Sequence, residues 1–418
     1  MLANQSTKLL PDIEPLDFLY QPQTLSIFEA AANQFIKAPN GTTEIWAASN
    51  DWFLEEWGRD TFIALSGLLL TRGRYREARE VFEHFAKYER NGLIPNAIRE
   101  SAVLYNTADA SLWYITALNQ YLKATADHDF IERMMPTIRS IIDNYINGTE
   151  YERFGNTYQI ALDSNDCLIY SPAQASWMDA DPSENGESIV TPRKGKCVEI
   201  NALWYAALRF AVELRSGGQE NKYYAELAEK VKSSFANRFW NDQNGYLFDV
   251  IDSDAAAAND AALRPNQVIA ISHGYDLIDP DQQFSILTVI KNKLLTPGGL
   301  RTLSPDDPHY HGSYNTSDPI PVKDLAYHQG TAWPWLIGPY CDALEIVLSQ
   351  RRVPAEKINR AVAETIAPLV KFCIDSEFKS LPELFSGNPP YDPGGTTSQA
   401  WSVAEVLRIL KKLTKAGQ

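Results

Sequence analysis

The sequence predicts one all-α domain of about twelve helices with long loops gathered at one end. Apolar residues recur at helical spacing in one segment after another, and no regular alternation of strands and helices interrupts them. Three connections, 150–197, 297–324 and 377–396, are much longer than ordinary turns, and such loops in a compact domain are usually functional. No change of composition marks a linker. We therefore expect a single domain over 1–418, in which 1–45 form an N-terminal arm and the first helix.

Apolar stripes and helix-breaking residues define the expected elements. Gly73 and Gly148 follow two of the stripes, as glycine commonly does where a helix ends. Tyr158-Gln159-Ile160 and 245–250 have the pattern of short strands, and the polar, proline-containing segment 1–21 suggests an extended arm. In chain order, the stripes predict helices over 24–37, 59–71, 75–89, about 107–124, 127–147, 198–215, 219–238, 264–272, 280–294, 327–350, 354–376 and 397–415.

Charge and composition exclude several classes of function. The 418 residues carry a formal net charge of -15, which disfavours binding to nucleic acid or to an anionic membrane surface. No run of 18 apolar residues occurs, and the N-terminus lacks the basic and apolar pattern of a signal peptide. The four cysteines form no CxxC pair and predict reduced, buried thiols. We therefore expect a cytoplasmic protein, and no feature indicates its oligomeric state.

Two acidic residues stand in apolar, aromatic surroundings. Asp179 follows Trp177 and Met178, and Glu383 lies in the segment Leu381-Pro382-Glu383-Leu384-Phe385. A carboxyl beside an aromatic face loses hydration, which raises its pKa and allows it to act as a general acid near neutral pH. Plainer interpretations are a turn for Asp179 and an exposed loop tip for Glu383. Two such acids among tryptophans match glycoside hydrolysis, in which one protonates the leaving oxygen and the other activates water or attacks the sugar.

Other polar residues suit the recognition of a sugar, although each also has a structural interpretation. Arg59 and Asp60 form a donor–acceptor pair fitted to vicinal hydroxyls, but alone they indicate a helix cap and a surface ion pair. Asp109 and Glu199 stand where helices are expected to begin, which the helix dipole favours. The segment 324–335 is dense in aromatic and hydrogen-bonding side chains, and its alternative is an aromatic core.

Motifs of other chemistries are missing from the sequence. The Gly195-Lys196 pair lacks the spacing of a phosphate-binding loop, and no GxSxG, HExxH or strand-linked GxGxxG occurs. The six histidines, including His309 and His311, are interpreted as loop or sugar-contacting residues. The sequence therefore predicts neither a metal nor an organic cofactor.

Nine segments extend this interpretation. They are WGRDTFIAL, IPN, YNTADASLWY, SWMDA, TPRKGKCVEINALWYAAL, LSPDDPHYHGSY, DLAYHQGTAWPWLIGPY, LPELFSG and SQAWSVAEVLR. From about residue 50 to 412, in this order, they resemble the glucosidase domain of glycogen debranching enzymes, the amylo-α-1,6-glucosidase family. Each segment alone is a weak signal, but nine in the family's order are specific.

The resemblance implies a fold, a mechanism and a set of site residues. The fold is an (α/α)6 barrel of twelve helices, and the mechanism is inverting, exo-acting release of glucose without a metal or cofactor. Asp179 matches the general acid and Glu383 the general base, while Arg59 and Asp60 match the pair that holds the terminal glucose. The residues implied to line the pocket are Trp57, Asp109, Trp177, Glu199, Tyr327, His328, Gln329 and Trp333.

The same resemblance leaves the substrate open. Only some 45 residues precede the first motif, so we expect neither the N-terminal β-rich domain of bacterial relatives nor a glucanotransferase module. The leading hypothesis is hydrolysis of α-1,6-branched α-glucans or oligosaccharides. Alternatives are an α-glucosidase acting on α-1,4 or other α-glucosides, a phosphorolytic enzyme, and a non-catalytic glucan-binding protein.

Overall fold

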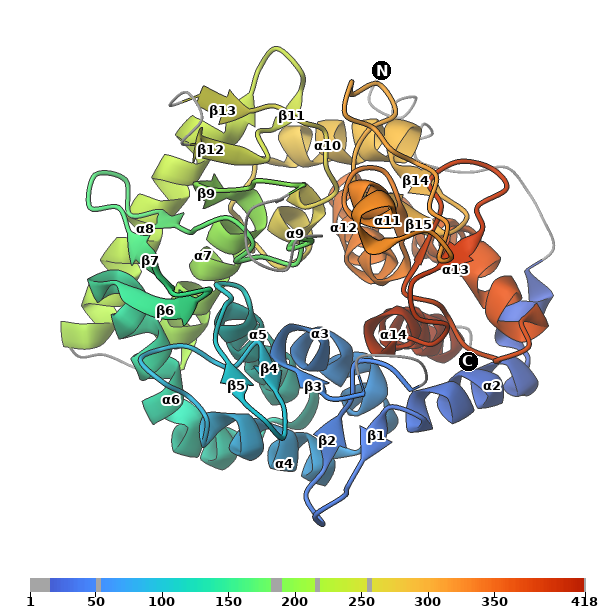
Figure 1. Ribbon diagram of the computed structural model, residues 1–418, viewed down its shortest axis with the longest axis horizontal. Helices are drawn as coiled ribbons and strands as arrows, with labels where there is room; N and C mark the ends of the chain where they lie inside the picture. Colours follow the sequence, from blue (N-terminus) through green and yellow to red (C-terminus); the bar gives the residue numbers. More distant parts are fainter. Residues whose placement is uncertain (1–15, 50–53, 182–189, 215–218, 254–257, 417–418) are drawn as a thin grey trace.

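Six helices form a closed inner ring in the computed structural model, which describes residues 16–49, 54–181, 190–214, 219–253 and 258–416. Each inner helix contacts the next around the ring, and the last contacts the first (Figure 1). The ring therefore encloses a single core. Its members are α3 (Gly58–Leu68), α5 (Ala110–Thr125), α7 (Val198–Glu213), α9 (Gln267–Ser272), α12 (Ile337–Gln350) and α14 (Ala400–Ala416).

Six further helices cover the outside of this ring. They are α2 (Pro22–Asn33), α4 (Tyr75–Ala86), α6 (His128–Asn147), α8 (Gln219–Phe239), α10 (Pro280–Lys293) and α13 (Ala355–Asp375). Helix α8 packs on α7, α10 on α9 and α12, and α13 on α12 and α14. A thirteenth α-helix among the described residues, α11 (Ile320–Tyr327), belongs to a long connection. The prediction of a mostly helical chain with about twelve helices is confirmed.

The two rings differ in burial in the way that their sequences require. Every residue of α3 is buried, including Arg59 and Asp60, because an inner helix has neighbours on all sides. The outer helix α4 buries only Ala78, Val81, Phe82 and Phe85 and exposes charged residues on its other face. An apolar stripe of that kind is the pattern of a helix with one side in water.

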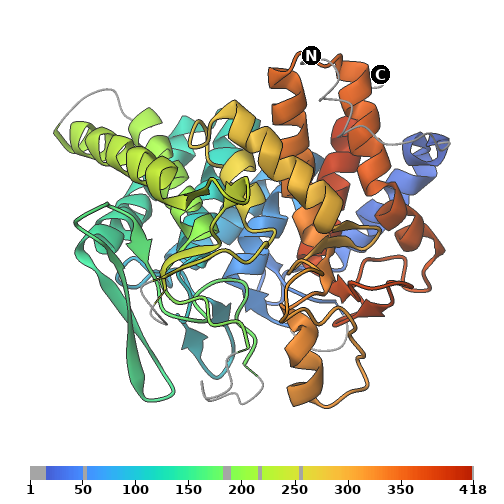
Figure 2. The ribbon, with the colours of Figure 1, turned by 90° about the horizontal axis from the view of Figure 1, so that it is seen from above.

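Short strands extend from one end of the rings, together with α11 (Figure 2). They pair as β1–β2, β3–β4–β5, β6–β7–β8, β13–β12–β9, β10–β11 and β14–β15–β16–β17–β18, and all of these pairs are antiparallel. The strands are Ile36–Lys37, Glu44–Ile45, Glu56–Trp57, Ala97–Ile98, Val103–Leu104, Thr149–Arg153, Asn156–Leu162, Ile169–Tyr170, Lys196–Cys197, Trp240–Asn241, Tyr246–Leu247, Val250–Ser253, Ala258–Asp260, Leu295–Thr296, Gly299–Arg301, Ala332–Trp333, Leu384–Phe385 and Pro393–Gly394 for β1 to β18.

The α-helix predicted over 327–350 is wrong over 328–336, where the only helical residues form a 3-10 turn at Pro334–Leu336. Tyr327 ends α11, β16 follows, and the inner helix α12 begins only at Ile337. Gly330 has a φ of 149°, which does not fit a right-handed helix. Pro334 restricts the residue before it to extended backbone, and Trp333 accordingly lies in β16. Aromatic residues with apparently helical spacing here form the floor of a cavity instead.

Other expectations have mixed outcomes. The strand over Tyr158–Ile160 is confirmed within β7, and the four cysteines are buried and unpaired. Most of the arm expected over 1–21 lies outside the described residues, but Asp17–Tyr20 form a 3-10 helix, so the prediction of extended chain is wrong there. In the described ranges, no helix combines the length and apolar character needed to cross a membrane.

Tryptophans fill the centre of the inner ring. The ring centroid of Trp335 lies 5.3 Å from that of Trp177, 5.4 Å from that of Trp401 and 6.3 Å from that of Trp113. Trp333 packs on Trp177 at 5.3 Å. The inner ring of helices therefore has a packed aromatic core, which can close the bottom of a cavity at its loop end.

The inner ring closes through a contact that leaves no room for a methyl group. A Cβ added to Gly67 in α3 would lie 2.0 Å from the carbonyl oxygen of Ala404 in α14. We expect Gly67→Ala to lower the free energy of unfolding by about 1–3 kcal/mol, because the helices must move apart. Urea denaturation measures this change. Adding Ala404→Gly should not restore the stability, because the atom in the way is the backbone carbonyl oxygen of residue 404. If Gly67→Ala is as stable as the wild type, this description of the packing is contradicted.

Candidate active site

A cavity of about 1170 Å³ opens at the loop end of the rings. It is larger than the ~300–1,000 Å³ of ordinary small-molecule pockets, so it has room for a ligand with several parts. Its floor consists of buried side chains, namely Arg59, Asp60, Trp177, His328, Trp333, Glu383, Gln399 and Trp401. Its rim is exposed and includes Arg90, Asn91, Arg99, Glu150, Glu152, Phe154 and Ile320.

Arg59 connects three segments of the chain at this floor. It is the second residue of α3, and its Nε lies 2.7 Å from Oδ2 of Asp109, which precedes α5. Its Nη1 lies 3.1 Å from Oδ2 of Asp179, and its Nη2 donates to Oγ1 of Thr107 at 3.1 Å. A planar guanidinium can make these contacts together. Arg59 therefore fixes the position of the Asp179 carboxylate.

Glu383 has both carboxylate oxygens engaged. It immediately precedes β17 and is 3% exposed. Oε1 accepts a hydrogen bond from the Tyr327 hydroxyl, and Oε2 accepts one from the backbone N–H of Thr396 at 3.2 Å. Burial raises the pKa of Glu383 to about 7, although these two donors oppose the rise. This carboxyl can therefore exchange a proton close to neutral pH.

Asp60 and Asp179 share the same cavity as Glu383. Burial raises the pKa of Asp60 to about 7; the charge of Arg59 opposes this rise, and that of Glu383 adds to it. Gln399 donates to Oδ1 of Asp60 at 2.9 Å. Burial also raises the pKa of Asp179, against the charges of Arg59 and Arg153. The cavity thus holds three acids whose environments favour a bound proton.

His328 lines the cavity and has buried hydrogen-bonding atoms without a partner in the described part of the chain. Neither of its ring nitrogens has a partner among the described protein groups, and the same holds for Nε1 of Trp401. Burial, aided by the positive charge of Arg264, lowers the pKa of His328 well below its usual value, so the ring is neutral. It is stacked on Trp333 with the centroids 5.1 Å apart. A neutral imidazole offers one donor and one acceptor, which suits a ligand hydroxyl.

Three of the residues expected to line the cavity, Asp109, Glu199 and Gln329, are not among those that line it in the structure. Asp109 holds Arg59, as described above. Glu199, the second residue of α7, pairs with Arg193, with Oε1 and Oε2 each 2.6 Å from a guanidinium nitrogen. Gln329 accepts from Arg264 at 2.6 Å. The expected lining residues that do face the cavity are Trp57, Trp177, Tyr327, His328 and Trp333.

Behind the floor, a buried network supports Trp177. Its indole N–H donates to Oδ1 of Asn266 at 2.8 Å, and Asn266 in turn donates to Asp249 at 2.8 Å. Arg193 bridges Asp249 and Ser176, at 2.6 and 2.9 Å. The network therefore orients the segment that leads to Asp179. Sequence reasoning missed Asp249 and Asn266, because each is a single polar residue without a motif; Gln399 and Trp401 stood in a recognised segment but were not selected.

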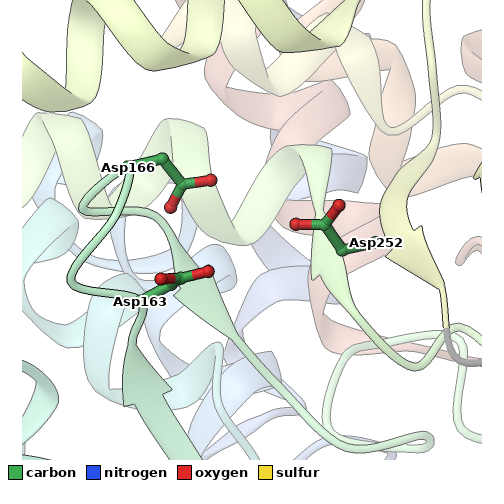
Figure 3. A group of neighbouring side chains, drawn as sticks. All are labelled: Asp163, Asp166 and Asp252. Carbon is green, nitrogen blue, oxygen red and sulfur yellow. The ribbon is translucent and has the colours of Figure 1, made fainter. Parts of the chain in front are cut away.

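One group of carboxylates in the described part of the chain is close enough to hold a metal ion: Asp163, Asp166 and Asp252 (Figure 3). Lys196 Nζ lies 2.7 Å from an oxygen of each of them, and Arg238 pairs with Asp166 and Asp252. Two protein cations therefore balance most of the charge that would attract a metal. None of these residues lines the cavity.

Comparison with known proteins places this chain in a family of glycoside hydrolases. The model of the family described as amylo-alpha-1,6-glucosidase matches residues 30–408, and the chain belongs to that family. The glycogen debranching enzyme of Saccharomyces cerevisiae is 25% identical over 454 residues, which cover 87% of this chain and 30% of the yeast protein. The chain thus spans about a third of the length of that relative.

Solved structures show the same fold at low sequence identity. A GH63 mannosylglycerate hydrolase from Thermus thermophilus, in complex with glucose, has a TM-score of 0.67 at 12% identity and covers 92% of this chain and 99% of its own. A rhamnosidase from Klebsiella oxytoca, with rhamnose bound, has a TM-score of 0.56 at 16% identity. The match covers 95% of this chain and 64% of the rhamnosidase chain. At such identities the likeness extends to the fold alone.

The raised pKa values make stability depend on pH in a defined direction. Asp60 and Glu383 have pKa values of about 7 in the folded protein, against usual values of 3.8 and 4.5. The folded state therefore retains protons at these two groups that the unfolded state releases, so their contribution to the free energy of unfolding falls as pH rises from about 4.5 to 7. Glu383→Gln removes one of these groups, so urea denaturation should give a shallower dependence in this window. A slope as steep as that of the wild type would contradict the burial of this charge.

Proposed function

We propose that the protein is an inverting, exo-acting glycoside hydrolase that releases glucose from α-1,6 branches of α-glucans or oligosaccharides, and that its double helical ring is an (α/α)6 barrel. Membership of the amylo-α-1,6-glucosidase family supports the substrate class. The observation that carries the mechanism is the pair Asp179 and Glu383, which line one cavity and differ in exposure.

The difference in exposure between the two side chains supports Asp179 as the acid and Glu383 as the base. Glu383 is 3% exposed at the floor, whereas the side chain of Asp179 is 25% exposed. An exo-acting enzyme holds the terminal sugar at the closed end of its cavity, and the leaving chain extends toward the mouth. The acid nearer the mouth faces the leaving oxygen and is Asp179. The deeper carboxylate faces the opposite side of the sugar and is Glu383.

The reaction then follows from the contacts of each group. Asp179, whose pKa burial raises, acts as the general acid and transfers its proton to the glycosidic oxygen as the bond to the anomeric carbon breaks. Glu383, held by Tyr327 and Thr396, removes a proton from the water that attacks this carbon. Asp60 and His328 offer acceptors and a donor for the hydroxyls of the terminal sugar, and the indole faces of the floor suit its C–H surface.

The stereochemistry of the first product tests this proposal. In proton NMR, the protein should release β-glucose first from a 6-O-α-glucosyl maltooligosaccharide and release none from maltotetraose. Early α-glucose would indicate retention and contradict the roles above. Release from maltotetraose alone would move the protein to α-1,4 linkages, and a requirement for phosphate would indicate phosphorolysis. Binding without turnover would leave a glucan-binding protein.

Two matched variants separate the acid from the base. Glu383→Gln should lower kcat by at least about 100-fold on every substrate, because water activation is always required. Asp179→Asn should lose as much on a natural glucoside but far less on a nitrophenyl glucoside, whose leaving group needs no proton. Circular dichroism checks that both variants fold. An equal loss for Asp179→Asn on both substrates would contradict its role as the acid.

A further inference from the structure

The hairpin β6–β7 projects from the loop end of the rings (Figure 2) and ends in an unusual turn. Strand β6 and the tip of the hairpin supply residues 150–154 of the cavity lining. Arg153 pairs with Asn156, so the turn consists of two residues, Phe154 and Gly155, with φ values of 51° and 73°. Positive φ at both positions is the mark of a type I′ turn, which favours Asn, Asp or Gly at its first position. A phenylalanine there is an outlier, because a bulky side chain crowds the left-handed backbone.

Among the described residues, no burial of Phe154 compensates for this strain. It is 41% exposed and lines the rim of the cavity. Its ring contacts the guanidinium of Arg153, with 4.6 Å between the guanidinium carbon and the ring centroid. Strained residues of this kind are retained where they serve a ligand or a mechanism. A large aromatic side chain at a costly turn position, facing a cavity, therefore indicates a contact with a ligand.

The base of the hairpin is fixed, so its tip has a defined position. Tyr151 is 5% exposed in the core and stacks on its cross-strand partner Tyr158, with the centroids 5.5 Å apart. Thr149 donates to the carbonyl oxygen of Asn91 at 2.7 Å, and this anchors the first residue of the hairpin to another part of the rim. The strain at the tip is therefore held in place by contacts lower in the hairpin.

The tip also lies on the leaving-group side of the cavity. Arg153 and Asp179 both line this cavity, and the positive charge of Arg153 opposes the rise of the pKa of Asp179. Asp179 is the residue that faces the leaving oxygen in the proposed mechanism. Arg153 forms no ion pair with a carboxylate within the described ranges, so its N–H donors are open to the hydroxyls of a sugar.

We propose that Arg153 and Phe154 form a binding site for the leaving glucan chain, beyond the sugar next to the cleaved bond. Phe154 stacks on the C–H face of a sugar ring of this chain, and Arg153 donates hydrogen bonds to its hydroxyls. The inference rests on the proposed function for the direction of the chain. It makes the preferred substrate a branch on an extended glucan rather than a disaccharide.

Phe154→Asn tests the site, because a structural role and a binding role predict opposite outcomes. Asparagine fits the first position of the turn, so thermal unfolding should occur at the same or a higher temperature than in the wild type. The ratio of kcat/KM for a 6-O-α-glucosyl maltooligosaccharide to kcat/KM for isomaltose should fall about tenfold, as expected for losing the burial of one aromatic side chain. The fall should come from KM.

Phe378→Ala is the matched control. Phe378 is 50% exposed and does not line the cavity, so removing it should leave the ratio unchanged. An unchanged ratio for Phe154→Asn, or equal losses on the two substrates, would overturn the proposed chain-binding site.

Calorimetry keeps the test independent of turnover. If the wild type cleaves neither substrate, the proposed function fails, but the affinity for the branched oligosaccharide can still be compared between the wild type and Phe154→Asn. Weaker binding by the variant, with isomaltose bound as by the wild type, supports the site at the hairpin tip. Equal affinities for the branched oligosaccharide, or no binding by the wild type, overturn it.

Discussion

The ion pairs of Arg59 are the interaction on which the cavity depends. Its guanidinium is 3% exposed and lies within 3.1 Å of both Asp109 and Asp179, and Asp60 is its neighbour in α3. Buried carboxylates without a compensating charge are strongly unfavourable. Arg59 permits several acids to gather at the ends of the inner helices, and its contact with Asp179 sets where the acid stands. Burial still dominates the pKa of Asp179 and of Asp60, so both remain able to hold a proton.

The fold could be predicted from the sequence where one side of a helix faces water. The outer helix α6 was expected over 127–147 and is found over His128–Asn147, because its apolar stripe and Gly148 are both visible. Inner helices have less of that contrast, because most of their residues are buried, but α7 was expected over 198–215 and is found over Val198–Glu213. The error in the helix predicted over 327–350 has a related cause. The aromatic residues at its start have a helix-like spacing but contribute to the cavity floor around Trp333. The positive φ of Gly330 interrupts the helical backbone there.

The site was predictable where several unusual residues stand together. Arg59, Asp60, Asp179 and Glu383 were all selected from the sequence, and the structure brings them to one cavity. The sequence did not separate residues that line the cavity from residues that support the lining, because the spacing of residues along the chain does not show which way a side chain points. Glu199, which pairs with Arg193, is an example. The strained turn at Phe154 was also invisible, since a backbone angle leaves no mark in a sequence unless a glycine or asparagine signals it.

A crystal structure with a non-hydrolysable, thio-linked α-1,6-branched oligosaccharide would test the central claim most directly. The quantity to measure is the separation of the Asp179 and Glu383 carboxyl groups across the bound terminal sugar. The account predicts about 6.5–9.5 Å, with a water molecule between Glu383 and the anomeric carbon and Asp179 at the linking sulfur. A separation of about 5 Å, or a sugar bound away from either acid, would contradict it.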